Sequence, residues 1–179
     1  MVKRGYVIIM LMMTVFAISI GFLVAVPAWQ TEVKREKEEE LIFRGRQYVE
    51  AVRLYVLKNP GRFPATLKEL YDKNFIRKLY KDPMTESGEW NVILNASTAG
   101  VAGTAGTGGA AENQVYVVPE RSLSSVRQAA VLGVVSSSRS PSVRVYNDQE
   151  SYDRWLFYFG QDPQKLPKII YYGEKVKGP

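Results

Sequence analysis

Residues 1–30 read MVKRGYVIIMLMMTVFAISIGFLVAVPAWQ, and this stretch decides how the rest of the chain is organised. The segment Tyr6–Val26 contains no charged side chain. About 20 apolar residues cross a hydrocarbon core of about 30 Å, whereas a secretory signal needs only about 7–15. The segment therefore predicts a transmembrane helix. Because Lys3 and Arg4 precede it, the positive-inside rule places the N-terminus in the cytoplasm. Cleavage by signal peptidase close to Ala28 is the alternative, and the neighbouring proline disfavours it.

The 179 residues include no cysteine and no histidine, which excludes disulfides, thiolate nucleophiles and zinc sites of the Cys/His type. Histidine is also the commonest general base at neutral pH. No stretch shows a recognisable spacing for a carboxylate pair or a Ser/Lys dyad. We therefore expect that the chain is not an enzyme and that it binds neither a cofactor nor a metal ion. The formal charge of +6 is mild, so we interpret it as a solvated surface and expect no nucleic-acid partner.

Residues 31–59 read TEVKREKEEELIFRGRQYVEAVRLYVLKN and predict a long helix. Its first part is highly charged, and we interpret the block Glu38–Glu40 as a solvated face. Apolar residues then recur with a period of about 3.6, which indicates packing on a domain. These residues are Leu41, Tyr48, Val52 and Tyr55. We expect the helix to end at residues 59–61, Asn-Pro-Gly, because proline and glycine are common just past a helix C-terminus.

Residues 62–93 read RFPATLKELYDKNFIRKLYKDPMTESGEWNVI. Thr66 and Glu69 have the spacing of a capping box for a short helix, and Asn74 is a candidate C-terminal stop. The turns that follow carry carboxylates that could hold calcium, at Asp82, Glu86 and Glu89. Their spacing matches no EF-hand, so we assign them to turns and predict no metal.

Residues 95–113 read NASTAGVAGTAGTGGAAEN, and this glycine- and alanine-rich composition predicts a flexible surface loop. The runs VYVVP, AAVLGVVSSS, SVRVYN and RWLFYF then predict short antiparallel strands, with Val143 and Val145 on one face. Gly133 marks either a bulge or the close approach of a helix. Residues 169–172 are a candidate edge strand. We assign the aromatic side chains of residues 152–159 to the core or to a subunit contact rather than to base stacking.

The tripeptide Lys3-Arg4-Gly5 directly before an apolar run resembles the leader of type IV pilins and type II secretion pseudopilins. The resemblance implies that a prepilin peptidase cuts between Gly5 and Tyr6 and N-methylates Tyr6. It also implies a helix kink at Pro27, with a simple end to the membrane span as the alternative. The family usually has a glutamate where this chain has Met10, so Met10 and Thr14 belong to a purely hydrophobic anchoring and assembly segment.

A second set of residues in the head carries the same resemblance, which covers residue 3 to about residue 93. The matching residues are Phe63-Pro64, Leu67, Leu70, Lys81-Asp82-Pro83 and Trp90. The implied fold is α+β, a pilin-like lollipop in which a long, half-transmembrane N-terminal helix packs on a small antiparallel sheet. The implied segments are a leader (1–5), a transmembrane helix (6–27), the periplasmic half of the helix (28–58), a short helix and first strand (59–94), the insert (95–113) and the C-terminal strands (114–179).

The resemblance implies a structural subunit of a type II secretion machine, anchored in the bacterial inner membrane with its head in the periplasm. Its partners would be other pseudopilins, the prepilin peptidase, an inner-membrane assembly platform and membrane lipid. The alternatives are a type IV pilin-like subunit for adhesion, motility or DNA uptake, and a single-pass periplasmic protein that does not assemble.

Overall fold

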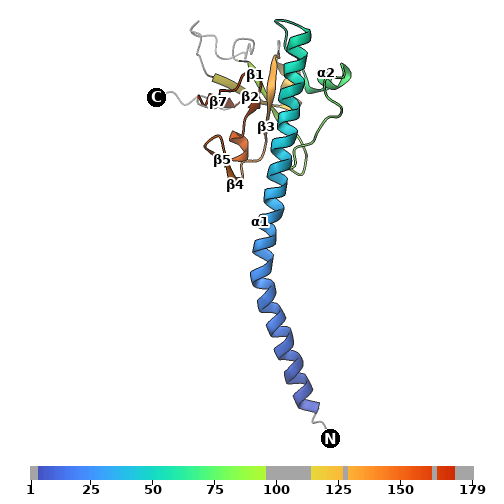
Figure 1. The fold of residues 1–179 in the computed structure, drawn as a ribbon, viewed down its shortest axis with the longest axis vertical. Helices are drawn as coiled ribbons and strands as arrows, with labels where there is room; N and C mark the ends of the chain where they lie inside the picture. Colours follow the sequence, from blue (N-terminus) through green and yellow to red (C-terminus); the bar gives the residue numbers. More distant parts are fainter. Residues whose placement is uncertain (1–3, 96–113, 127–128, 163–164, 172–179) are drawn as a thin grey trace. The chain divides into compact units, whose positions relative to one another are not determined.

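The computed structural model describes residues 4–95, 114–126, 129–162 and 165–171, with only the backbone of residues 4, 5 and 24–28. Most of the leader, the predicted loop at 96–113 and the C-terminal tail therefore lie outside the described residues. The chain is an α+β protein that divides into two compact units, residues 1–37 and 38–179, and each is described by itself (Figure 1). We call the second unit the head.

The first element, α1, is a single α-helix of 55 residues, Arg4–Lys58. It confirms the prediction of a long helix that ends before Asn59. Gly61, with φ of +77°, turns the chain away from the helix, and Pro60 has no N–H with which to continue it. The helical backbone continues through Pro27, whose side chain lies outside the described residues, so the predicted kink stays a prediction.

The predicted stripe of α1 is the helix side of the hydrophobic core. Leu41, Tyr48, Val52 and Tyr55 are each 4% exposed or less. They pack against buried side chains from one face of the sheet and from the segment that follows α1. The 3.6-residue period of the sequence therefore identified the face of α1 on which the head folds.

The short helix α2, Leu67–Asp72, has both predicted ends. The Glu69 N–H donates to Thr66 Oγ1 at 3.1 Å, and the Glu69 carboxylate accepts the Ala65 N–H at 2.7 Å. At the other end Asn74 has φ of +61°, and the Phe75 N–H reaches back to the Leu70 carbonyl at 2.9 Å, as in a Schellman motif. These local signals were sufficient to predict α2.

The sheet of the head is mixed, not purely antiparallel as predicted. Its order is β6-β3-β1-β2-β7, from β6 (Phe157–Tyr158), β3 (Val131–Ser136), β1 (Trp90–Asn95), β2 (Gln114–Pro119) and β7 (Lys168–Tyr171). The β2–β7 pair is parallel, and the other pairs are antiparallel. Because a parallel pair needs a long crossover, the chain passes through β3 and β6 before β7 returns to the opposite edge. The edge-strand prediction at residues 169–171 is confirmed.

The predicted strand around residues 141–146 does not join this sheet. Strand β4 (Pro141–Tyr146) pairs only with β5 (Gln149–Ser151). Asn147 and Asp148 connect them with φ of +48° and +58°, which suits a two-residue type I′ hairpin turn. The hairpin presents Val143 and Val145 at its surface, 39% and 63% exposed. Within the described parts of the chain, 3₁₀ turns lie between strands at η1 (Glu120–Ser125) and η2 (Tyr152–Arg154).

Candidate functional site

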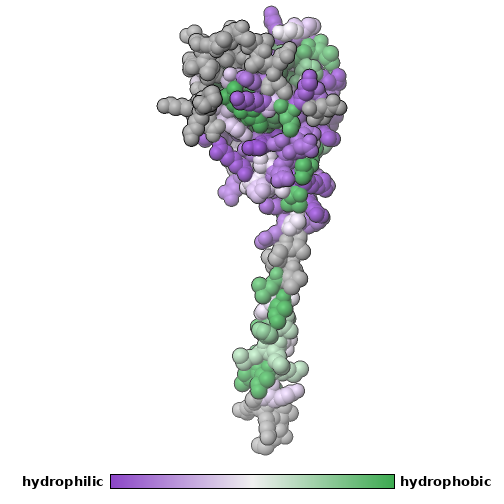
Figure 2. All heavy atoms as spheres, turned by 90° about the vertical axis from the view of Figure 1, so that its left-hand side faces the viewer, coloured by the Kyte–Doolittle hydropathy of each residue, from purple (hydrophilic) through white to green (hydrophobic). Residues whose placement is uncertain are grey.

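The first candidate site is the apolar part of α1. Residues Tyr6–Leu23 form an 18-residue helical segment with a mean hydropathy of 2.4, and none of it is buried. By length and composition it can cross a membrane, and it is the one such helix among the described residues. In Figure 2 hydrophobic side chains predominate along this segment.

The two aliphatic hydroxyl groups of this segment, those of Thr14 and Ser19, are satisfied within the helix. Thr14 Oγ1 donates to the Met10 carbonyl at 2.7 Å, and Ser19 Oγ donates to the Val15 carbonyl at 2.8 Å. A hydroxyl that bonds the carbonyl one turn earlier exposes no unpaired donor to lipid. Both residues are therefore compatible with a hydrocarbon environment.

Of the predicted site residues in α1, the structure joins Met10 and Thr14 by a direct contact. Met10 and Thr14 lie one helical turn apart and are joined by that hydrogen bond. Tyr6 and Met10 are exposed, at 67% and 61%. Gly5 lies in the first turn of α1. Met10 thus presents a thioether to the surroundings of the helix.

The second candidate site lies where α1 enters the head, and it contradicts one prediction. Glu38, which the charge pattern assigned to a solvated face, is 0% exposed. Its Oε1 accepts hydrogen bonds from the Val143 N–H at 2.6 Å and the Tyr152 hydroxyl at 2.8 Å. Its Oε2 accepts the Arg144 N–H at 3.2 Å. The prediction holds for Glu39 and Glu40, which are exposed.

This carboxylate attaches the β4–β5 hairpin to α1. Removing a carboxylate from water costs several kcal/mol unless donors replace the water, and hydrogen bonds to a charged group contribute about 1.5–3 kcal/mol. A second link is the ion pair between Arg144 and Glu39, with 2.6 Å between Nη2 and Oε1. Burial, followed by the hydrogen bond from Tyr152 to Glu38 and the charge of Glu38, raises the pKa of Tyr152. Tyr152 therefore stays a hydrogen-bond donor at neutral pH.

A second buried carboxylate, Asp82, organises the turn before β1. Its Oδ1 accepts the Met84 N–H at 2.8 Å, and its Oδ2 accepts the Ser136 hydroxyl at 2.7 Å and the Ser137 N–H at 3.3 Å. Burial raises the pKa of Asp82, although these hydrogen bonds oppose the shift. Asp82 thus joins its turn to the end of β3, which is a structural role.

The described residues contain no group of three or more Asp, Glu, His or Cys side chains that could hold a metal ion. Asp82 is engaged by three hydrogen-bond donors, whereas Glu86 and Glu89 are exposed. A cation at Asp82 would have to displace those donors.

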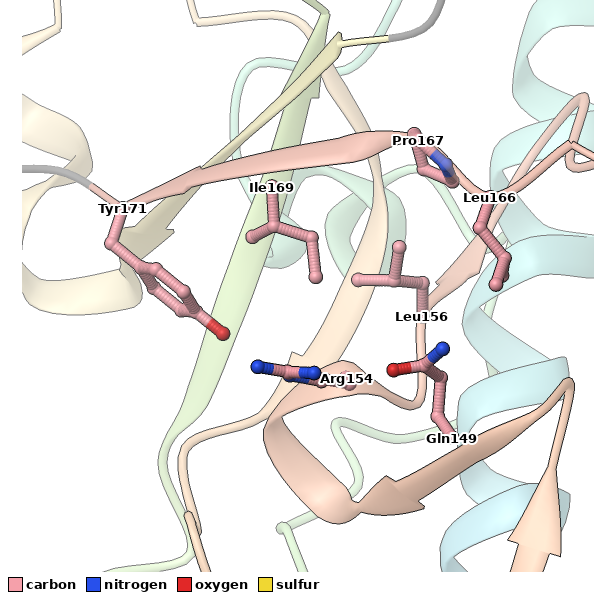
Figure 3. Close-up of a pocket in the computed structure, with 7 residues that line it drawn as sticks. All are labelled: Gln149, Arg154, Leu156, Leu166, Pro167, Ile169 and Tyr171. Atoms are coloured by element: carbon pink, nitrogen blue, oxygen red, sulfur yellow. The ribbon is translucent and has the colours of Figure 1, made fainter. Parts of the chain in front are cut away.

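A cavity of about 270 Å³ lies between β7 and the β5–β6 region (Figure 3). Its lining is mixed: the polar side chains are Gln149, Arg154 and Tyr171, and the apolar ones are Leu156, Leu166, Pro167 and Ile169. The Tyr171 hydroxyl donates to Asp153 Oδ2 at 3.1 Å. A second cavity of about 330 Å³ shares Gln149 and Arg154 with it.

No family model matches the chain, no curated protein matches it, and no solved structure matches it.

Proposed function

We propose that the chain is a pseudopilin-like structural subunit of a type II secretion or related filament machine. Residues 6–23 would hold it in the bacterial inner membrane, and the head would lie in the periplasm. Its function would be assembly through the N-terminal helix into a short filament that moves exported protein. The partners would be other subunits of that filament, the prepilin peptidase and the assembly platform.

The observation that carries this proposal is the arrangement of α1. A basic Lys3-Arg4-Gly5 junction directly precedes an apolar segment of membrane length. The same helix continues to Lys58 and carries on its later turns one side of the hydrophobic core of an α+β head. This combination supports a subunit that is anchored and assembled through its N-terminal helix, because one helix supplies both the membrane-length segment and a side of the core of the head.

Met10 favours a second candidate, an anchored protein that does not assemble. In lipid a carboxylate at this position would need a partner, such as the amine of a neighbouring subunit. A methionine cannot form that pair. Without that pair nothing in the membrane segment besides apolar helix packing would hold it to a neighbouring subunit, which favours an anchored protein that does not assemble.

The test is the intact mass and N-terminal residue of the membrane-extracted protein, expressed with and without a prepilin peptidase. We expect the peptidase to remove residues 1–5 and leave a methylated Tyr6. A matched Gly5→Val variant should stay uncut, because a side chain at the cleavage site hinders access to the backbone. An uncut wild-type chain, or a cut near Ala28, would contradict the filament proposal.

A further inference from the structure

The cavity between β7 and the β5–β6 region lies over the face of the sheet that points away from α1. Successive side chains of a strand point to opposite faces. In β1, Val92 belongs to the hydrophobic cluster that includes α1, whereas Ile93 belongs to a second cluster. Leu156 is a buried member of the second cluster, Ile169 packs against it, and both line the cavity. An apolar group in the cavity would therefore extend a cluster that the fold already contains.

Two polar side chains, those of Arg154 and Gln149, lie across this cavity from Leu156 and Ile169 (Figure 3). Within the described parts of the chain, no carboxylate lies at ion-pair distance from the Arg154 guanidinium. The adjacent carboxylate, that of Asp153, accepts the Tyr171 hydroxyl at 3.1 Å instead. Among the described residues the Gln149 carboxamide also has no hydrogen-bond partner. A ligand in the cavity can therefore meet one cation and one amide on its polar side.

The second cavity adjoins the first, because Gln149 and Arg154 line both. It has a volume of about 330 Å³, and its lining carries charges of both signs, on Arg139, Asp148 and Glu150. Such a lining suits a polar chain better than an apolar group. The two cavities thus place a partly apolar chamber and a charged chamber on either side of one guanidinium and one carboxamide.

We propose that the two cavities bind the C-terminal end of a polypeptide whose last residue has a branched apolar side chain. A guanidinium binds a carboxylate through two parallel hydrogen bonds, so Arg154 would take the terminal carboxylate. The last side chain would enter the first cavity and contact Leu156 and Ile169. The Gln149 carboxamide carries both donors and an acceptor, so it matches the peptide group next to that carboxylate. The residues before the last one would lie in the second cavity.

The size and the charges of the cavities favour this ligand over other carboxylates. Pockets for drug-sized ligands measure about 300–1,000 Å³, whereas the first cavity has about 270 Å³, which suits one side chain and not a long acyl chain. A free short-chain acid would pair with Arg154 but would leave the Gln149 carboxamide and the second cavity unused. Asp148 and Glu150 favour a basic residue before the last one. This binding requires neither cleavage at Gly5 nor filament assembly.

The experiment uses the full chain in nanodiscs of zwitterionic phosphatidylcholine and the peptide Gly-Ser-Gly-Ala-Lys-Leu with fluorescein on its N-terminus. Fluorescence anisotropy measures binding of this peptide and of the same peptide with a C-terminal amide. The test variant is Arg154→Gln. The matched control is Arg121→Gln, which removes the same charge from an exposed arginine outside both linings. Circular dichroism should show the same fold for both variants, because both arginines are exposed. Unlabelled isocaproate, which has a leucine-like chain and a carboxylate but no peptide group, serves as the competitor.

We expect saturable binding of the free-acid peptide to the wild-type chain and binding at least about tenfold weaker to Arg154→Gln, because the pair of a guanidinium and a carboxylate is among the strong hydrogen-bonded contacts. Arg121→Gln should bind the peptide as the wild type does. The amidated peptide should bind the wild type at least about tenfold more weakly and should hardly distinguish it from Arg154→Gln.

Three results would overturn the proposal: no saturable binding, equal affinity for the free-acid and amidated peptides, or equal losses in the two variants. Isocaproate that binds as tightly as the peptide would overturn it in favour of a small free carboxylic acid.

Discussion

At the scale of single residues, Glu38 shows how a charged side chain becomes part of a core. It lies one position before Glu39, yet its carboxylate accepts two backbone N–H groups and one tyrosine hydroxyl, while Glu39 is exposed and pairs with Arg144. No ion pair joins Glu38 to a cation within the described ranges. The negative charge of Glu38 is compensated by hydrogen-bond donors. A neutral side chain with fewer acceptor oxygens would leave at least one of these donors without an acceptor.

We predict that Glu38→Gln lowers the free energy of unfolding by about 2–3 kcal/mol, because the amide NH₂ would face a donor where an oxygen now accepts one. Denaturant titration of the full chain in detergent, followed by fluorescence of the buried Trp90 and Trp155, measures it. Glu39→Gln is the control and should change stability by less than about 1 kcal/mol, since its ion pair is exposed. Equal effects of the two substitutions would show that the Glu38 carboxylate does not hold the hairpin.

At the scale of elements, α1 and the sheet meet through glycines on both sides of Phe157. A Cβ atom on Gly45 of α1 would lie 2.4 Å from the Phe157 ring, and a Cβ on Gly133 of β3 would lie 1.9 Å from the Phe157 carbonyl oxygen. The β1–β3 register also shifts next to Gly133. Of the two interpretations of Gly133, the bulge is confirmed, and the close neighbour is strand β6 rather than a helix.

We predict that Gly45→Ala destabilises the head by about 1–3 kcal/mol through overpacking against Phe157, although alanine is the better helix former by about 1 kcal/mol. Thermal unfolding of the full chain measures it. In a Phe157→Leu background the same substitution should cost clearly less, because the ring that the new methyl group meets is gone. If Gly45→Ala raised the melting temperature instead, α1 would not approach β6 this closely.

At the scale of the whole molecule, the buried polar groups couple stability to pH. The pKa of Asp82 is raised above its ordinary value of 3.8 by burial. Between 3.8 and the folded-state pKa the native head therefore binds more protons at this site than the unfolded chain does. In that window the contribution of Asp82 to the free energy of unfolding falls as pH rises.

We predict that the stability difference between wild type and Asp82→Asn depends on pH in this direction. The wild-type advantage should be greatest below about pH 4 and should decrease as pH rises through the folded-state pKa of Asp82, because the asparagine does not titrate. Denaturant titrations of both proteins across the acid range provide the measurement. A wild-type advantage that grew with pH would mean that the folded-state pKa is lowered.

The sequence by itself determined the features that depend on neighbours a few residues away. The extent of α1, its end before Asn59, the cap and stop of α2, the buried stripe of α1 and the edge strand β7 all follow from periodicity and from local residue preferences. The membrane-length segment belongs here too, because hydrophobicity over 18 consecutive residues is a local property.

Only the tertiary structure decided the features that join distant parts of the chain. Glu38 meets its first backbone donor 105 residues later, so nothing near it in sequence distinguishes it from Glu39. The parallel β2–β7 pair and the glycines around Phe157 likewise need segments that fold back on one another. A residue's own preferences act over about one helical turn, whereas burial and charge pairing are set by whichever segment the closed chain brings against it.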